Sequence, residues 1–252
     1  IPHFVAIRRY DLGVDIELLE KYLLKNTIMR KGKCFNLKTK RYITAIIPVH
    51  VFGHPCDLDG VMRISKKFKL KVIEDAADGI GSFYKKKHVG TIADLGVLSF
   101  NGNKTITTGC GGMILTNNNS LARTIKHRIA TAKIFHPFKY EHDQHGFNAK
   151  LPALNASIGY SQMLRIKKIL LQKRMLFSKY KSFFKKIDFI DIMTEPKNCS
   201  SNFWLQTVFI NQKKTSTRDR ILKELIKRKI NARAGWTLIP LLNPYKKYPK
   251  MN

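Results

Sequence analysis

The first two thirds of the chain alternate short apolar runs with amphipathic segments. Apolar residues at helical spacing predict helices over residues 15–24, 57–68 and 120–129. Apolar runs with β-branched residues predict strands over residues 4–7, 43–49, 70–73, 95–100 and 113–116. Residues 26–41 are basic and weakly patterned, and we expect a loop there. Residues 43–75 read as strand, helix and strand, a βαβ unit whose loops gather at the carboxyl ends of parallel strands.

The last third has a different pattern. A polar, histidine-rich connection over residues 135–145 leads to a helical pattern over residues 155–184, long enough that we expect a break in it. A strand is predicted over residues 204–210, and a helix over residues 217–230 opens with Thr217 and Asp219 near its cap. We therefore expect an α/β fold. Residues 1–160 form a large domain, a mostly parallel sheet with helices on both faces, and residues 161–252 form a linking helix and a partial, smaller α+β domain.

Composition adds a strong positive charge and few cysteines. The formal net charge is +30, which favours nucleic-acid binding, but the basic residues are scattered through every kind of segment. A lysine-rich background explains them better, and specific nucleic-acid binding stays an alternative. Cys34, Cys56, Cys110 and Cys199 stand too far apart for a structural zinc site, so no metal is expected. The sequence shows no signal peptide and no membrane-spanning apolar run, so we expect a cytoplasmic protein without membrane contact.

Candidate chemistry gathers at the ends of two predicted strands. Asp75 ends one of them, and Ser99 ends the next and leads into the loop SFNGNKTITTGCGG, which holds Lys104. Alone, Asp75 reads as a helix cap or salt bridge, and one lysine in so basic a chain reads as a surface charge. Together they are what pyridoxal 5'-phosphate (PLP) requires. The amine forms a Schiff base with the aldehyde, the carboxylate keeps the pyridine nitrogen protonated, and the hydroxyl with nearby amides holds the phosphate.

Several longer stretches carry a family resemblance. They read VIEDAADGIGSFYKKKHVGTIADLGVLSFNGNKTITTGCGGMILTNN, AIIPVHVFGHPCDLDG, HDQHGFNAKLPALNASIGYSQM, NFWL and ARAGWTL, and they extend over nearly the whole chain. The sequence resembles the sugar-nucleotide aminotransferases of the DegT/StrS family, which are PLP enzymes of fold type I. SFNGNK and GWTL are most similar to the LegC-type subgroup, which aminates 4-keto-6-deoxy UDP-N-acetylhexosamines for cell-surface glycans.

The resemblance implies roles for residues around the cofactor. Lys104 would be the Schiff-base lysine, Asp75 the partner of the pyridine nitrogen, and Ser99 a phosphate ligand. Asp78 stands where the family usually has Gln or Glu near the cofactor ring.

Further roles implied by the resemblance concern the partner subunit and the substrates. Asn148 would reach the phosphate in the neighbouring subunit of a homodimer. Arg233 and Trp236 would face the sugar-nucleotide substrate, and glutamate is the expected amino donor.

The chain also departs from the family pattern. Ala149 and Lys150 replace a Tyr-Arg pair, Cys110 replaces the third glycine of the loop, and Ile239 or Pro240 stands where a histidine is expected. The alignment leaves roughly a hundred residues of the family's N-terminal part without a counterpart, as much as an ordinary domain. Two alternatives therefore remain beside an aminotransferase: an inactive fragment or remnant of that family, and a basic nucleic-acid-binding protein.

Overall fold

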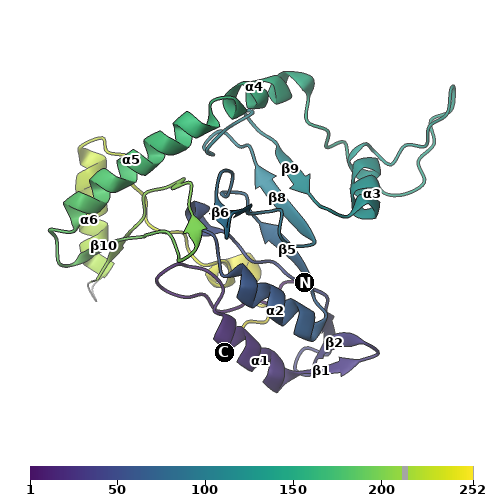
Figure 1. Cartoon of the computed structure of the whole chain (residues 1–252). Coiled ribbons are helices and arrows are strands. Elements are labelled where there is room, and N and C mark those ends of the chain that lie inside the picture. Colours follow the sequence, from purple (N-terminus) through teal and green to yellow (C-terminus); the bar gives the residue numbers. More distant parts are fainter. Residues whose placement is uncertain (212–214, 252) are drawn as a thin grey trace.

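A four-stranded sheet forms the centre of the computed structural model, which describes residues 1–211 and 215–251. Its strand order is β4-β5-β8-β9, with β4 to β8 parallel and β9 antiparallel at the edge (Figure 1). The strands are β4 (Ala45–Ile46), β5 (Lys71–Asp75), β8 (Leu95–Ser99) and β9 (Gly112–Leu115). The predicted α/β class and mostly parallel sheet are confirmed.

The βαβ unit forms as expected, with α2 (Leu58–Phe68) between β4 and β5. The Asp57 side chain caps α2 by accepting the N–H of Gly60 at 3.0 Å. The apolar face of α2 packs against β5 and against α1 (Ile16–Asn26), whose N-cap is Asp15. The buried core between these elements includes Leu19, Leu23, Val61, Ile64 and Val72.

The prediction of a loop over residues 26–41 is wrong. The structure has a three-stranded antiparallel meander there, formed by β1 (Thr27–Arg30), β2 (Lys33–Asn36) and β3 (Arg41–Ile43). Lys31 and Gly32 join the first two strands with positive φ angles of 51° and 72°, as a two-residue hairpin turn requires. Only β2 is largely buried, so exposed lysines and arginines hide the strand pattern in the sequence.

Other predicted strands are shorter than expected. Of residues 43–49 only Ala45 and Ile46 form β4, and Ile43 ends β3. Pro48 has no N–H to donate, and beyond it Val49 makes an isolated parallel bridge with Asp75. Residues 4–7 make only isolated bridges, one of them beside Lys250 in the last part of the chain. Within residues 204–210 only β12 (Val208–Ile210) is a strand, and it pairs with β10 (Ile190–Ile192).

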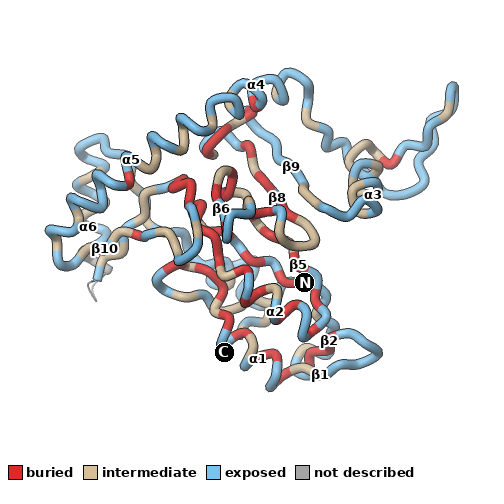
Figure 2. The backbone as a smooth tube through the Cα atoms, viewed as in Figure 1, coloured by how far each residue is buried: buried red, intermediate tan, exposed pale blue. Residues whose placement is uncertain are grey.

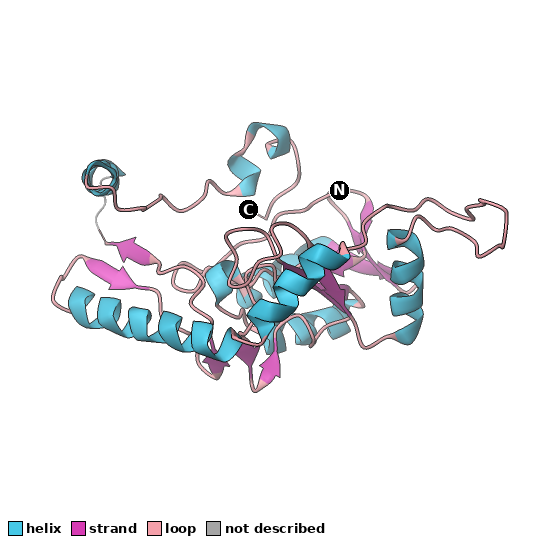
Figure 3. Cartoon of the chain, turned by 90° about the horizontal axis from the view of Figure 1, so that it is seen from above, coloured by secondary structure: helices cyan, strands magenta, loops and turns pink. Residues whose placement is uncertain are grey.

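The predicted helix over residues 155–184 is broken, as expected. It forms α4 (Ala153–Met163) and α5 (Ile166–Phe184), which run along one side of the molecule (Figures 1 and 3). The remaining helices are α3 (Asn119–Ile129) and α6 (Thr215–Lys227), with short 3-10 turns η1 (Val51–Gly53), η2 (Ile239–Leu241) and η3 (Asn243–Tyr245). Helix α6 begins two residues before the predicted Thr217. Among residues 1–211 and 215–251, no helix is both long and apolar enough to cross a membrane.

A small sheet joins the two halves of the chain. β11 (Cys199–Ser200) pairs with β6 (Phe83–Tyr84), which pairs with β7 (Lys87–His88). Buried residues gather around β5, β8 and this small sheet, whereas α3, α4 and the projecting residues 133–150 are largely exposed (Figure 2). The C-terminal segment that follows β11 therefore starts inside the core of the N-terminal half.

Candidate active site

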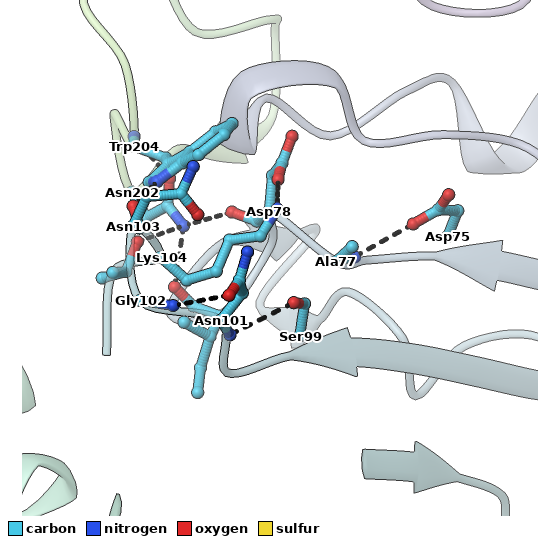
Figure 4. A network of polar contacts seen from close by, with 12 residues as sticks. Asp75, Ala77, Asp78, Ser99, Asn101, Gly102, Asn103, Lys104, Asn202 and Trp204 are labelled. Atoms are coloured by element: carbon cyan, nitrogen blue, oxygen red, sulfur yellow. Dashed lines mark hydrogen bonds and ion pairs between the residues drawn. The ribbon is translucent and has the colours of Figure 1, made fainter. Parts of the chain in front are cut away.

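Lys104 lies in the loop after β8 and forms an ion pair with Asp78 (Figure 4). Both side chains are mostly buried, with exposed fractions of 14% for Lys104 and 9% for Asp78. Asp78 lies on the turn that follows β5, so two neighbouring strands supply the two charges. Lys104 is thus fixed in a cluster beside the carboxyl ends of parallel strands, where the sequence placed it.

An aromatic ring and an amide complete the surroundings of Lys104. The Lys104 Nζ lies 4.4 Å from the ring centroid of Trp204, within the range of a cation–π contact. The Trp204 Nε1–H donates to the carbonyl of Asn103 at 2.6 Å. Asn202 is buried, and its Nδ2 donates to the carbonyls of Asp78 and Ile80 at 2.7 and 2.8 Å.

Asp78 is the carboxyl group of this cluster whose pKa is perturbed. Burial raises its pKa, and the Lys104 ammonium and the backbone N–H of Phe52 oppose that rise without cancelling it. The nearby carboxylate of Asp75 adds to the rise. Phe52 reaches this position in a left-handed conformation, with φ 56° and ψ 22°.

Asp75 and Ser99 share one face of the central sheet. Asp75 pairs with Val97 across β5 and β8, and Ser99 stands two residues further along β8, so all three side chains point to the same side. One Asp75 carboxylate oxygen accepts the N–H of Ala77 at 3.1 Å, and the Ser99 hydroxyl accepts a long contact of 3.4 Å from the Asn101 N–H. This face is open enough that Val97 remains 37% exposed.

A cavity of about 2680 Å³ adjoins these groups. Asp75 and Asp78 line it from the sheet, and Arg233 and Trp236 line it from the C-terminal segment. The Trp236 ring packs edge-on against Phe52 at 5.2 Å and lies 6.3 Å from the Trp204 ring. The structure therefore brings the two predicted substrate residues to the same cavity as Asp75 and Asp78, whereas Ser99 and Lys104 do not line it.

The structure places Asn148 elsewhere. It is exposed, and its backbone bridges Ala130 just after α3, at the base of the segment that projects from the body (Figure 1). Cys110, the residue that departs from the glycine pattern, is exposed, and its carbonyl accepts a hydrogen bond from the Thr108 hydroxyl at 2.6 Å.

Sequence reasoning missed the contribution of the C-terminal segment to the Lys104 cluster. Asn202 and Trp204 lie within the NFWL stretch, but nothing in its pattern shows that it folds back onto a loop a hundred residues earlier. Glu74 was also missed, although an acid inside an apolar strand is a visible signal of a buried polar network. Its carboxylate accepts His50 Nε2–H at 3.1 Å and the N–H groups of Gly90, Ile92 and Ala93 at 2.7, 2.8 and 2.8 Å.

Comparison with known sequences gives a match along the whole chain. Residues 1–252 match the model of the DegT/DnrJ/EryC1/StrS aminotransferase family. The GDP-perosamine synthase of Escherichia coli O157:H7 is 32% identical over 207 residues, which are 81% of this chain and 56% of that protein. The GDP-perosamine synthase of Caulobacter vibrioides is 33% identical over 205 residues, covering 80% of this chain and 54% of that protein. The chain thus spans little more than half the length of these relatives.

Solved structures show the same fold. Helicobacter pylori PseC, an aminotransferase involved in pseudoaminic acid biosynthesis, matches with a TM-score of 0.86 and 24% identity over 98% of this chain and 62% of that one. Spr1654 of Streptococcus pneumoniae, solved in a PLP form, matches with a TM-score of 0.83 and 23% identity over 98% of this chain and 64% of that one.

Proposed function

Because the chain belongs to the DegT/DnrJ/EryC1/StrS aminotransferase family, we propose that its central sheet carries PLP-binding residues of an enzyme that transfers an amino group to a keto-sugar nucleotide. Members of this family depend on PLP. The observation that carries the proposal is the cluster at the sheet edge, where Lys104, Asp78 and the open face with Asp75 and Ser99 lie together.

The donor set fits PLP. The cofactor needs an amine to bond its aldehyde, a carboxylate for its pyridine N–H and donors for its phosphate. Lys104 supplies the amine, and Asp75 offers a carboxylate that lines the cavity and accepts one backbone N–H. Within residues 1–211 and 215–251 the Ser99 hydroxyl makes one long contact, with the Asn101 N–H, which leaves it able to donate to a phosphate oxygen.

Each residue then has a stated task. Bound PLP supplies an electron sink that stabilises negative charge on the substrate carbon. Asp75 would orient the ring through its nitrogen, and Ser99 would hold the phosphate. Lys104 would take up the substrate proton at Nζ and return it. The Asp78 carboxylate would balance the positive charge of the Lys104 Nζ whenever that nitrogen is an ammonium. The ion pair is mostly buried, so it would hold the Lys104 side chain in place away from bulk water.

The cavity suits a substrate larger than an amino acid. With a volume of about 2680 Å³, this broad and partly open cleft has room for a sugar nucleotide. Arg233 would pair with the diphosphate, and the exposed ring of Trp236 would pack on the sugar or the base. We propose a 4-keto-6-deoxy nucleotide sugar as acceptor and glutamate as donor, for glycan biosynthesis.

A homodimer completes the proposal. Asn148 lies on the exposed segment that projects away from the body, so it would serve the phosphate of a second copy (Figure 1). The same segment exposes Phe135, Phe138, Tyr140 and Phe147, with exposed fractions from 67% to 94%, as a dimer contact requires.

The proposal is tested by trapping the cofactor on the chain. The protein is incubated with PLP and reduced with borohydride, and the peptides are analysed by mass spectrometry. We expect the label on the peptide that contains Lys104 and no label there in Lys104→Arg. Lys133, an exposed lysine over the Tyr140 ring, reports background labelling. Label spread over surface lysines, with Lys104 no more labelled than Lys133, would contradict the proposal and favour an inactive remnant.

A further inference from the structure

Trp204 is fixed on four sides. Its backbone N–H donates to the Asn202 Oδ1 at 2.8 Å, and its carbonyl accepts from the Lys173 Nζ on α5 at 3.2 Å. Its indole N–H donates to the Asn103 carbonyl at 2.6 Å, and its ring face receives the Lys104 Nζ at 4.4 Å from the centroid. The residue is only 5% exposed, so these contacts form away from bulk water.

We propose that Trp204 is a positioning residue for Lys104, holding both ends of that lysine. The indole N–H fixes the backbone just before the lysine, and the ring face fixes its ammonium (Figure 4). A long, flexible side chain that is held at both ends keeps one conformation. A lysine whose amine must reach the same cofactor carbon in every turnover needs such a fixed conformation. This inference rests on the proposed function only in taking Lys104 as the reactive amine.

Asn202 extends the same device to the other partner of the ammonium. The Asn202 side chain accepts the backbone N–H of Trp204 and also donates to the backbone carbonyl of Asp78. One buried amide therefore ties together the backbones of the two residues, Trp204 and Asp78, whose side chains flank Lys104. Asn202 is 1% exposed and its amide nitrogen also donates to the Ile80 carbonyl, so the two backbone segments are joined away from water.

The test measures how freely Lys104 reacts, without PLP. The folded chain is treated with formaldehyde and a mild reductant, and the methylation rate of each lysine is followed by peptide mass spectrometry. Trp204→Leu removes the ring and the indole N–H, so Lys104 should be methylated between about twofold and thirtyfold faster, the factor that a cation–π contact is worth. Trp204→Phe keeps a ring face and should give a smaller increase.

Tyr140→Leu is the matched control. Lys133 Nζ lies 3.6 Å from the Tyr140 ring centroid, a second lysine–ring pair far along the chain from Lys104. This variant should speed methylation of Lys133 and leave Lys104 unchanged. Circular dichroism establishes that each variant is folded.

Two results overturn the inference. One is a wild-type methylation rate of Lys104 in folded Trp204→Leu. If Trp204→Leu does not fold, a wild-type rate in Trp204→Phe overturns it instead. Borohydride trapping of PLP on wild-type protein keeps the two proposals separate: absent trapping on Lys104 rejects the function, whereas the methylation rates still decide the role of Trp204.

Discussion

Replacing Glu74 with glutamine should destabilise the fold strongly, although the two side chains have the same shape. The Glu74 carboxylate is completely buried and accepts four N–H groups, two at each oxygen. His50 Nδ1 accepts the Cys56 N–H, so the proton of its neutral ring is on Nε2 and points to Glu74. Every donor around Glu74 is thus an N–H that needs an acceptor.

The magnitude follows from counting those donors. The glutamine amide nitrogen cannot accept a hydrogen bond, so two of the four N–H groups lose their partner. A hydrogen bond to a charged group is worth about 1.5–3 kcal/mol, which gives a loss of about 3–6 kcal/mol in the free energy of unfolding. Folded domains have about 5–15 kcal/mol in total, so the variant should be close to unfolding.

The assay is urea denaturation followed by circular dichroism, from which the midpoint and slope give the free energy of unfolding. Glu20→Gln is the matched control, because that carboxylate pairs with Arg63 and Lys67 on the surface and its loss should hardly move the midpoint. Equal midpoints for Glu74→Gln and wild type would refute the reasoning.

The acid limb of the stability curve gives a second measurement on the same residue. Burial alone would raise the Glu74 pKa, but the His50 and backbone N–H donors outweigh it and leave the pKa lowered. A lowered pKa means that this stability is fully present above the unfolded pKa of about 4.3 and is lost as pH falls through the folded value. Wild-type stability should therefore fall in that range more steeply than that of Glu74→Gln.

Three further predictions address the site and its support. Gly53→Ala should destabilise the fold by more than about 1 kcal/mol in urea denaturation, because φ is +86° and the new Cβ would lie 1.8 Å from the Asn202 Oδ1. Gly32→Ala, with φ +72° and open space around it, should lower the free energy of unfolding by less, and equal losses would argue against the Asn202 contact. Asp75→Asn should keep its bond to the Ala77 N–H and change the unfolding free energy by less than about 1 kcal/mol, while PLP titration and amine transfer both weaken sharply; near-normal turnover would count against the pyridine role. Mixing Lys104→Ala and Asn148→Ala chains should restore some activity by forming one intact site, and strict inactivity of demonstrated mixed dimers would show that each site comes from one chain.

Much of the fold could be predicted because its signals are local. Strand β5 and helix α2 have clear periodicity, and Asp15 and Asp57 mark the helix starts where the structure has them. The meander of β1 to β3 could not be predicted, since its pairing depends on a turn at Lys31 and Gly32 and on the burial of Cys34 in the core cluster that includes residues of α1. Apolar content alone overestimated the length of β4, because Ile47, which directly follows the strand, is 58% exposed.

The candidate site was predictable where its residues follow strands and not where they come from the other half of the chain. Asp75 and Ser99 stand at strand ends and Lys104 lies in the loop after β8, so their proximity follows from parallel pairing. Trp204 and Asn202 reach the same place only through tertiary packing, across about a hundred residues of sequence. Sequence periodicity carries no information about such a contact. Lys104 could therefore be predicted from the sequence, whereas the residues that hold it could not.

The position of those contacts bears on how the chain divides into domains. A boundary after residue 160 remains a prediction, but segments on both sides of it build the Lys104 cluster. Asn202 donates to Asp78, Ile80 and Thr105, and β11 adds a strand to β6 within the first half. Without the segment around Asn202, the Asp78 and Ile80 carbonyls would lose their donors, and Lys104 would lose its ring. Lys104 is therefore held in place only once the segment around Asn202 and Trp204 has folded onto the sheet. Substitutions in that segment should be felt at Lys104 before they are felt in the core of α1 and α2.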